Sequence, residues 1–102
     1  MQRRFLILTP HLTEFMLLDG NPMSEMRFIE AVREGLREEM ESDSHVFLIG
    51  QDIGVNGGVF RVTEGLQAQF GTDRVIDSPL AESGLLGLAI GSAMNGMRPV
   101  VE

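Results

Sequence analysis

Apolar residues recur at helical spacing between residues 24 and 41, with Arg and Glu on the opposite side of the repeat. The apolar positions are Met26, Ile29, Val32, Leu36 and Met40. This spacing predicts an amphipathic helix of about four turns. Ser24 is a favourable N-cap residue, and the polar run Ser42-Asp43-Ser44 is expected to end the helix.

Three short apolar runs predict strands. The run from Val46 to Ile49 is continuous and ends at Gly50, which suits a strand buried on both faces of a parallel sheet. A second brief run covers residues 74–77 and ends at Ser78-Pro79, because Pro holds the residue before it in an extended conformation. Val100-Val101 is expected to begin a third strand.

Two further helices are expected between these strands, over residues 62–70 and 80–96. Gly71 is a typical C-terminal stop for the first. The second is rich in small residues, which are Gly84, Gly87, Ala89, Gly91, Ser92, Ala93 and Gly96. Each Gly inside a helix costs about 1 kcal/mol relative to Ala, so these residues favour tight packing against another element or another subunit. The alternation of helices and strands predicts an α/β fold.

Composition narrows the class of protein without identifying a function. The chain has 102 residues, about one small domain, and 15 acidic against 8 basic residues give a net charge of −7. No basic run is present to neutralise phosphates, which argues against nucleic-acid binding. Cys is absent, which excludes a disulfide scaffold and a cysteine nucleophile. No apolar run reaches the roughly 20 residues of a membrane span, so no membrane partner is expected.

Residues 1–22 differ from the rest of the chain. Arg3-Arg4 and the apolar residues that follow resemble the start of a signal peptide. However, Pro10 interrupts the apolar run, and no small-residue cleavage site follows. We expect a disordered N-terminal extension over residues 1–22 and a folded part over residues 23–102.

Candidate chemistry lies where the predicted strands end, because ligands of open α/β sheets bind beyond the carboxyl ends of the strands. Two segments qualify: Gln51-Asp52 with the glycine loop that follows, and residues 80–84. Glu82 begins a helical segment that carries no other ionisable residue as far as Met97, and we expect partial burial of its carboxylate. The residues alone leave open whether Glu82 acts on a ligand or stabilises the helix dipole from the surface.

Four segments carry a resemblance to a known family, namely residues 46–54, 57–66, 70–84 and 87–102. Their order resembles the beta subunits of thiamine-diphosphate-dependent 2-oxo acid dehydrogenases of the pyruvate and branched-chain type. The resemblance covers residues 23–102 and implies a parallel-sheet thiamine-diphosphate-binding fold. The chain would form the N-terminal part of the pyrimidine-binding domain. Because that family continues beyond the last residue, we expect the domain to be truncated.

The resemblance implies a catalytic and cofactor-binding role for Glu82. In the family a Glu precedes a pair of spaced glycines, and Gly87 and Gly91 complete that pattern here. That Glu hydrogen-bonds the aminopyrimidine ring of thiamine diphosphate and favours the tautomer that removes the proton from the thiazolium carbon. The Leu80 position supplies a contact to the same ring. Gln51 replaces the Glu of many relatives, in which this position belongs to an acidic connection between paired active sites.

The resemblance also implies an activity and partners. The activity is oxidative decarboxylation of a 2-oxo acid with acyl transfer to a lipoyl domain. The alternatives are an acetoin dehydrogenase beta subunit and a non-catalytic α/β interaction module. The partners are an alpha subunit that holds the diphosphate and Mg²⁺, a second beta subunit in a heterotetramer, and a lipoyl acyltransferase core. The compartment is the bacterial cytoplasm, with the mitochondrial matrix as the alternative. We expect the isolated chain to be inactive.

Overall fold

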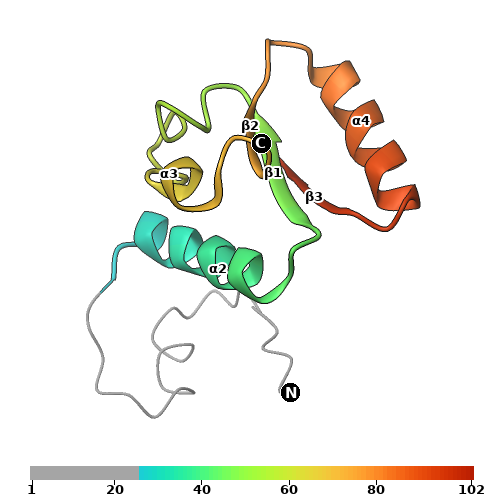
Figure 1. The fold of residues 1–102 in the computed structure, drawn as a ribbon. Coiled ribbons are helices and arrows are strands. Elements are labelled where there is room, and N and C mark those ends of the chain that lie inside the picture. Colours follow the sequence, from blue (N-terminus) through green and yellow to red (C-terminus); the bar gives the residue numbers. More distant parts are fainter. Residues whose placement is uncertain (1–25) are drawn as a thin grey trace.

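The computed structural model describes residues 26–102, so the prediction for residues 1–22 lies outside the described part (Figure 1). Helices and strands alternate along the chain. They are α2 (Phe28–Ser42), β1 (Val46–Gly50), α3 (Leu66–Phe70), β2 (Val75–Asp77), α4 (Glu82–Met94) and β3 (Arg98–Val101). This order confirms the predicted α/β fold.

The strands form one parallel sheet in the order β2-β1-β3, with β1 in the centre. Leu48 of β1 pairs with Val75 on one side and with Val100 on the other. Every residue of β1 is buried, as its continuous apolar sequence predicts. Parallel neighbours need a crossover connection, and α3 and α4 provide the two crossovers.

Successive residues of β1 point to opposite faces of the sheet, and each face has its own apolar core. The first core is composed of Met40, Val46, Leu48, Ile53, Leu66 and Val75. On the other face, Phe47 and Ile49 pack with Leu85 of α4. In Figure 1, α2 and α3 lie on one side of the sheet and α4 lies on the other. The sheet is therefore the middle layer of three.

All three described helices begin later than their sequences predict, and α4 begins at Glu82 instead of Leu80. α2 begins at Phe28, so Ser24 is not its N-cap and that prediction is wrong. α3 begins at Leu66 because residues 62–65 form turns and Gly65 adopts a left-handed conformation with φ of 82°. Helical spacing alone does not separate the residues before a helix from its first turn, which explains these differences.

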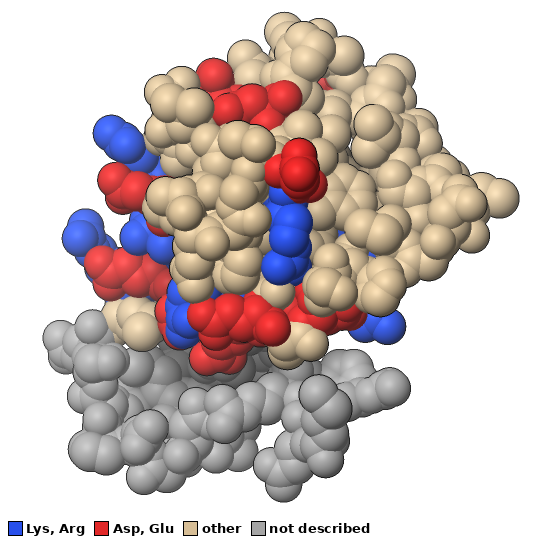
Figure 2. Space-filling view, in the orientation of Figure 1, with Lys and Arg blue, Asp and Glu red and all other residues tan. Residues whose placement is uncertain are grey.

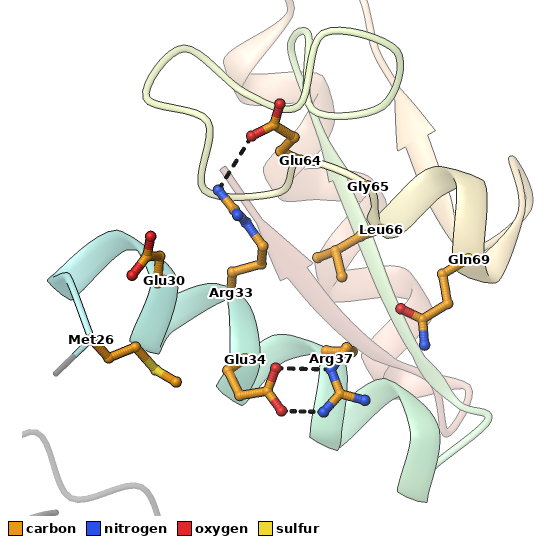
Figure 3. A pocket seen from close by; sticks show the side chains of 9 residues that line it. All are labelled: Met26, Glu30, Arg33, Glu34, Arg37, Glu64, Gly65, Leu66 and Gln69. Carbon is orange, nitrogen blue, oxygen red and sulfur yellow. Dashed lines mark hydrogen bonds and ion pairs between the residues drawn. The ribbon is translucent and has the colours of Figure 1, made fainter. Parts of the chain in front are cut away.

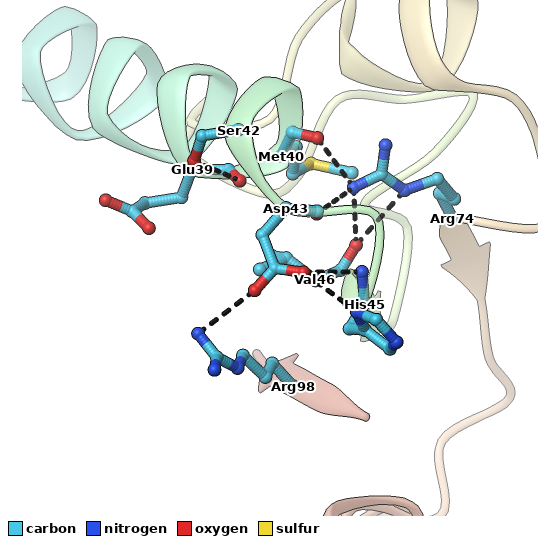
Figure 4. Close-up of polar contacts among 8 residues, drawn as sticks. All are labelled: Glu39, Met40, Ser42, Asp43, His45, Val46, Arg74 and Arg98. Atoms are coloured by element: carbon cyan, nitrogen blue, oxygen red, sulfur yellow. Dashed lines mark hydrogen bonds and ion pairs between the residues drawn. The ribbon is translucent and has the colours of Figure 1, made fainter. Parts of the chain in front are cut away.

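Arg74 closes the corner where α2 leads into β1 (Figure 4). Its guanidinium donates hydrogen bonds of 2.8 Å to the backbone carbonyls of Met40, Asp43 and Val46. The same group lies over the Phe70 ring, 5.1 Å from its centroid. Carbonyls at the end of a helix have no partner within the helix, so Arg74 satisfies acceptors that would otherwise need water.

The Asp43 carboxylate ties the same corner to β3. It accepts a hydrogen bond of 2.8 Å from the backbone N–H of His45 and forms an ion pair of 3.0 Å with Arg98 (Figure 4). The His45 N–H, followed by the His45 ring and the charge of Arg98, lowers the pKa of Asp43 below its ordinary value of 3.8. This corner is therefore sensitive to acid.

α4 differs from α2 because it is apolar on all sides. It buries only Leu85 and Ala89. The large side chains that it leaves exposed are Leu86, Leu88, Ile90 and Met94. A Cβ added at Gly87 or Gly91 would meet no other described atom within 4 Å. Within residues 26–102 these two glycines pack against no other element, so packing against another subunit stays the prediction. Among the described helices, none combines the length and apolar character of a membrane span.

Candidate functional site

The crevice at the carboxyl ends of β1 and β2 is the candidate site. The connection after β1 leads to α3 on one face, and the connection after β2 leads to α4 on the other face (Figure 1). Adjacent strands whose connections diverge in this way leave a crevice in which ligands of open α/β sheets bind. A hollow of about 220 Å³ lies there. Its lining residues are Gln51, Val59, Pro79, Leu80, Ala81, Glu82, Leu85 and Glu102.

The hollow brings together the two segments that the sequence singles out. Gln51 directly follows β1, and Leu80 and Glu82 come from the connection between β2 and α4. Asp52 is not part of the lining; it forms a turn and has a φ of 56°. Asp is among the few residue types that tolerate this left-handed conformation, so its role in the described chain is conformational.

Glu82 is the first residue of α4, where the free N–H groups and the helix dipole favour a negative charge. The residue is exposed, so the predicted partial burial is wrong for the described chain. The reason is that α4 buries only Leu85 and Ala89, which leaves its first turn open on the side of Glu82. An ionised carboxylate there can only accept hydrogen bonds, which suits a ligand that presents N–H groups.

Leu80 adds an apolar surface beside this acceptor. The residue is 73% exposed, which leaves its apolar side chain accessible to a ligand. Small-molecule sites combine apolar contact area with a few placed polar groups, and Leu80, Glu82 and the Gln51 amide make up such a combination. The arrangement suits a flat, hydrogen-bonding heterocycle.

Glu102 and Val59 line the hollow but were missed from the sequence. Glu102 follows β3, and its backbone N–H donates a hydrogen bond of 3.1 Å to the carbonyl of Ile49. The rule that strand ends carry ligand contacts, applied to the third strand, would have found it. The lining therefore holds two carboxylates, Glu82 and Glu102, and no Arg, so it repels phosphate groups. Within residues 26–102, no three His, Asp or Glu side chains are grouped to hold a metal ion.

A larger hollow, of about 330 Å³, lies between α2 and the start of α3 (Figure 3). Its Arg side chains are already engaged by the chain itself. Arg33 donates a hydrogen bond of 3.1 Å to the Val62 carbonyl and lies 3.7 Å from a Glu64 oxygen. Arg37 forms a two-point ion pair with Glu34. Because these cations serve internal contacts, this hollow is the weaker candidate despite its size.

Most of the chain is similar to known proteins. The family described as transketolase, pyrimidine binding domain, matches residues 24–102. The pyruvate dehydrogenase E1 component subunit beta of Bacillus subtilis is 58% identical over 80 residues. The protein of the same name from Staphylococcus aureus is 56% identical over 80 residues. These alignments cover 78% of this chain and 25% of each relative. The chain thus spans about a quarter of the length of the curated relatives it matches.

Proposed function

The chain belongs to the family of transketolase pyrimidine-binding domains, and on that premise we propose that it contributes the pyrimidine side of a thiamine-diphosphate site in a 2-oxo acid dehydrogenase beta subunit. The proposed reaction is the oxidative decarboxylation of a 2-oxo acid with transfer of the acyl group to a lipoyl domain. The names of the two relatives favour pyruvate over a branched-chain acid as the substrate.

The observation that carries this proposal is the meeting of Gln51, Leu80 and Glu82 in one hollow at the strand ends. Their chemistry fits the aminopyrimidine end of the cofactor. Leu80 offers apolar contact to a flat ring, and the Glu82 carboxylate offers an acceptor for a ring N–H. The Gln51 amide can both donate and accept a hydrogen bond.

When bound, the cofactor supplies the electron sink for decarboxylation. Glu82 would accept a hydrogen bond from a ring nitrogen and exchange a proton with it. Glu82 is the first residue of α4 and the only carboxylate of that helix. Residues 83–97 contain no ionisable group, and Glu102 is the second carboxylate in the lining. Leu80 would hold the ring in place and exclude water from one of its faces.

The diphosphate end of the cofactor requires a different surface. Glu82 and Glu102 make the hollow acidic, and the net charge of −7 adds to the repulsion of an anion. We assign the diphosphate and Mg²⁺ to a partner alpha subunit, in which helix or loop N–H groups would hold them. For this reason we expect the 102-residue chain alone to bind the cofactor weakly and to have no activity.

The proposed assembly is a heterotetramer of alpha and beta subunits that passes acyl groups to a lipoyl acyltransferase core. The apolar surface of α4 supports contact with another subunit, because a helix that is apolar all round is normally buried. The proposed compartment is the bacterial cytoplasm, in keeping with the bacterial source of both relatives.

Glu82→Gln in the assembled enzyme tests the proposal. Gln keeps the size of the side chain and removes the charge that exchanges the proton, so we expect kcat to fall by about 10²–10⁴-fold. Cofactor affinity, measured by calorimetric titration, should fall only modestly. Glu38→Gln removes the same charge from an exposed position on α2 and is the matched control. A Glu82→Gln enzyme with a kcat within about twofold of the wild type contradicts the assignment.

The same assay separates the alternatives. An acetoin dehydrogenase would turn over acetoin and leave 2-oxo acids unchanged. A non-catalytic interaction module would assemble with its partner and turn over neither compound. In that case Glu82→Gln and Glu38→Gln would behave alike, because an interaction module has no need of a carboxylate in the hollow.

A further inference from the structure

The loop after β1 forms one wall of the hollow and does not hold its shape through regular structure. Gln51 and Val59, the two ends of the segment 51–59 of this loop, both line the hollow. Between them, Asp52, Gly57 and Gly58 have φ values of 56°, 75° and 86°. Backbone in such conformations persists when surrounding contacts hold it. Part of this support lies within the loop, where the Gly58 N–H donates a hydrogen bond of 2.7 Å to the Asp52 carbonyl, and part comes from groups outside it.

The Asp77 carboxylate is such a group. Its Oδ1 accepts a hydrogen bond of 2.7 Å from the backbone N–H of Gly54, and its Oδ2 accepts one of 3.2 Å from Val55. A Cβ at Gly54 would lie 2.5 Å from Asp77 Oδ2, so only glycine allows this approach. Hydrogen bonds to a charged acceptor are stronger than those between neutral groups. One side chain thus anchors the middle of the loop at two adjacent points.

Asp77 also belongs to the opposite wall. It is the last residue of β2, and the chain continues directly through Ser78 to Leu80 in the lining. The backbone N–H of Ser78 donates a hydrogen bond of 3.0 Å to the carbonyl of Gly50, the last residue of β1. The two walls are therefore joined by a hydrogen bond at the ends of their strands. Asp77 adds a second connection, from the end of β2 to the Gly54 and Val55 N–H groups of the loop.

We propose that Asp77 is a positioning residue that sets the separation between the loop wall, with Gln51 and Val59, and the wall with Leu80 and Glu82. The inference rests on the function proposed above, since the group held between these walls would be the heterocycle of the cofactor. Asp77 does not line the hollow, so it acts through the Gly54 and Val55 N–H groups and not by touching the ligand.

Amide hydrogen exchange in the full chain tests the anchor without any cofactor. Asp77→Asn keeps the shape of the side chain but presents one oxygen and one NH₂ group, so one of the two N–H groups loses its acceptor. We expect exchange at Gly54 or Val55 to become about tenfold faster or more, with exchange at Leu48 unchanged. Asp73→Asn is the matched control, because Asp73 is exposed and does not line the hollow. Unchanged exchange at both loop amides would overturn the proposal.

Cofactor titration of the assembled enzyme tests the consequence, with thiamine diphosphate as the probe. We expect Asp77→Asn to raise the half-saturating concentration about tenfold and to leave kcat at saturation within about twofold. Asp77→Glu keeps both acceptor oxygens, so the half-saturating concentration should rise less than in Asp77→Asn. The Glu variant replaces the Asn variant in this test if the latter does not assemble. Unchanged affinity in both variants, or a loss of kcat with unchanged affinity, overturns the positioning role. Full activity in Glu82→Gln would instead contradict the proposed function and leave the exchange result standing.

Discussion

The two faces of the sheet carry opposite kinds of helix. On one face, α2 is amphipathic and directs its Arg and Glu side chains outward, where Arg37 pairs with Glu34 and Glu41. On the other face, α4 has no charged residue after Glu82. Figure 2 displays this difference, with charged side chains gathered over α2 and a largely uncharged surface on the side of α4.

The comparison indicates that the two faces of the sheet have different roles. The α2 face is packed within the chain, because its core includes residues from two helices and two strands. Arg74 also donates a hydrogen bond to the Met40 carbonyl near the end of α2. The α4 face has a small core around Leu85 and leaves much of an apolar helix exposed. The candidate site lies at the strand ends, where Leu85 and the start of α4 form part of its lining. We infer that the α2 face supplies the stability of the domain and that the α4 face serves binding and assembly.

Truncation of one core residue on each face should give the largest loss of stability. It tests whether the α2 face stabilises the domain more than the α4 face does. Leu48→Ala removes a side chain that is 2% exposed in the larger core, and we expect the free energy of unfolding to fall by about 2–5 kcal/mol. For Leu85→Ala, in the smaller core, we expect a loss of unfolding free energy at the lower end of that range. Urea unfolding of the full chain measures both variants. A larger loss for Leu85→Ala would show that the α4 face stabilises the domain more than the α2 face does.

A substitution in α4 sharpens the comparison by separating folding from assembly. Gly91→Leu adds a side chain into open space and replaces a poor helix former, so the chain should gain up to about 1 kcal/mol of stability. The same bulk should weaken assembly with the proposed subunits, because it overpacks a helix contact. Urea unfolding and size-exclusion chromatography of the co-expressed subunits measure the two effects. Normal assembly of the variant would mean that this side of α4 stays open in the enzyme.

The smallest effect concerns the charged corner beside the α2 face. Because the pKa of Asp43 is lowered on folding, its stabilisation is fully present above the ordinary value of 3.8. It is lost as the pH falls through the lower value of the folded state. Asp43→Asn should therefore reduce stability at neutral pH and make the acid side of the stability profile less steep. Urea midpoints between about pH 6 and pH 2 test this, and an unchanged profile would contradict the role of the corner.

Local patterns account for most of the elements that form. The continuous apolar run of β1 and the stop at Ser78-Pro79 after β2 lie where the sequence predicts. The first residues of α2 and α3 were placed too early, because apolar residues at helical spacing also precede each helix in the sequence. The site was predicted in part. Gln51, Leu80 and Glu82 came from strand ends, whereas the Asp77 anchor joins residues that no local pattern relates.

The sequence by itself determined which segments form helices and strands, because apolar periodicity, Gly and Pro act on neighbouring residues. It also determined that Leu80 and Glu82 stand together at the start of α4. Only the tertiary structure decided that Gln51 and Glu102 join them, that Asp77 holds the loop after β1, and that α4 leaves Glu82 exposed. The physical reason is that these contacts depend on the strand order β2-β1-β3 and on the face that each crossover helix covers. Those choices are made by packing between segments that are distant in the chain.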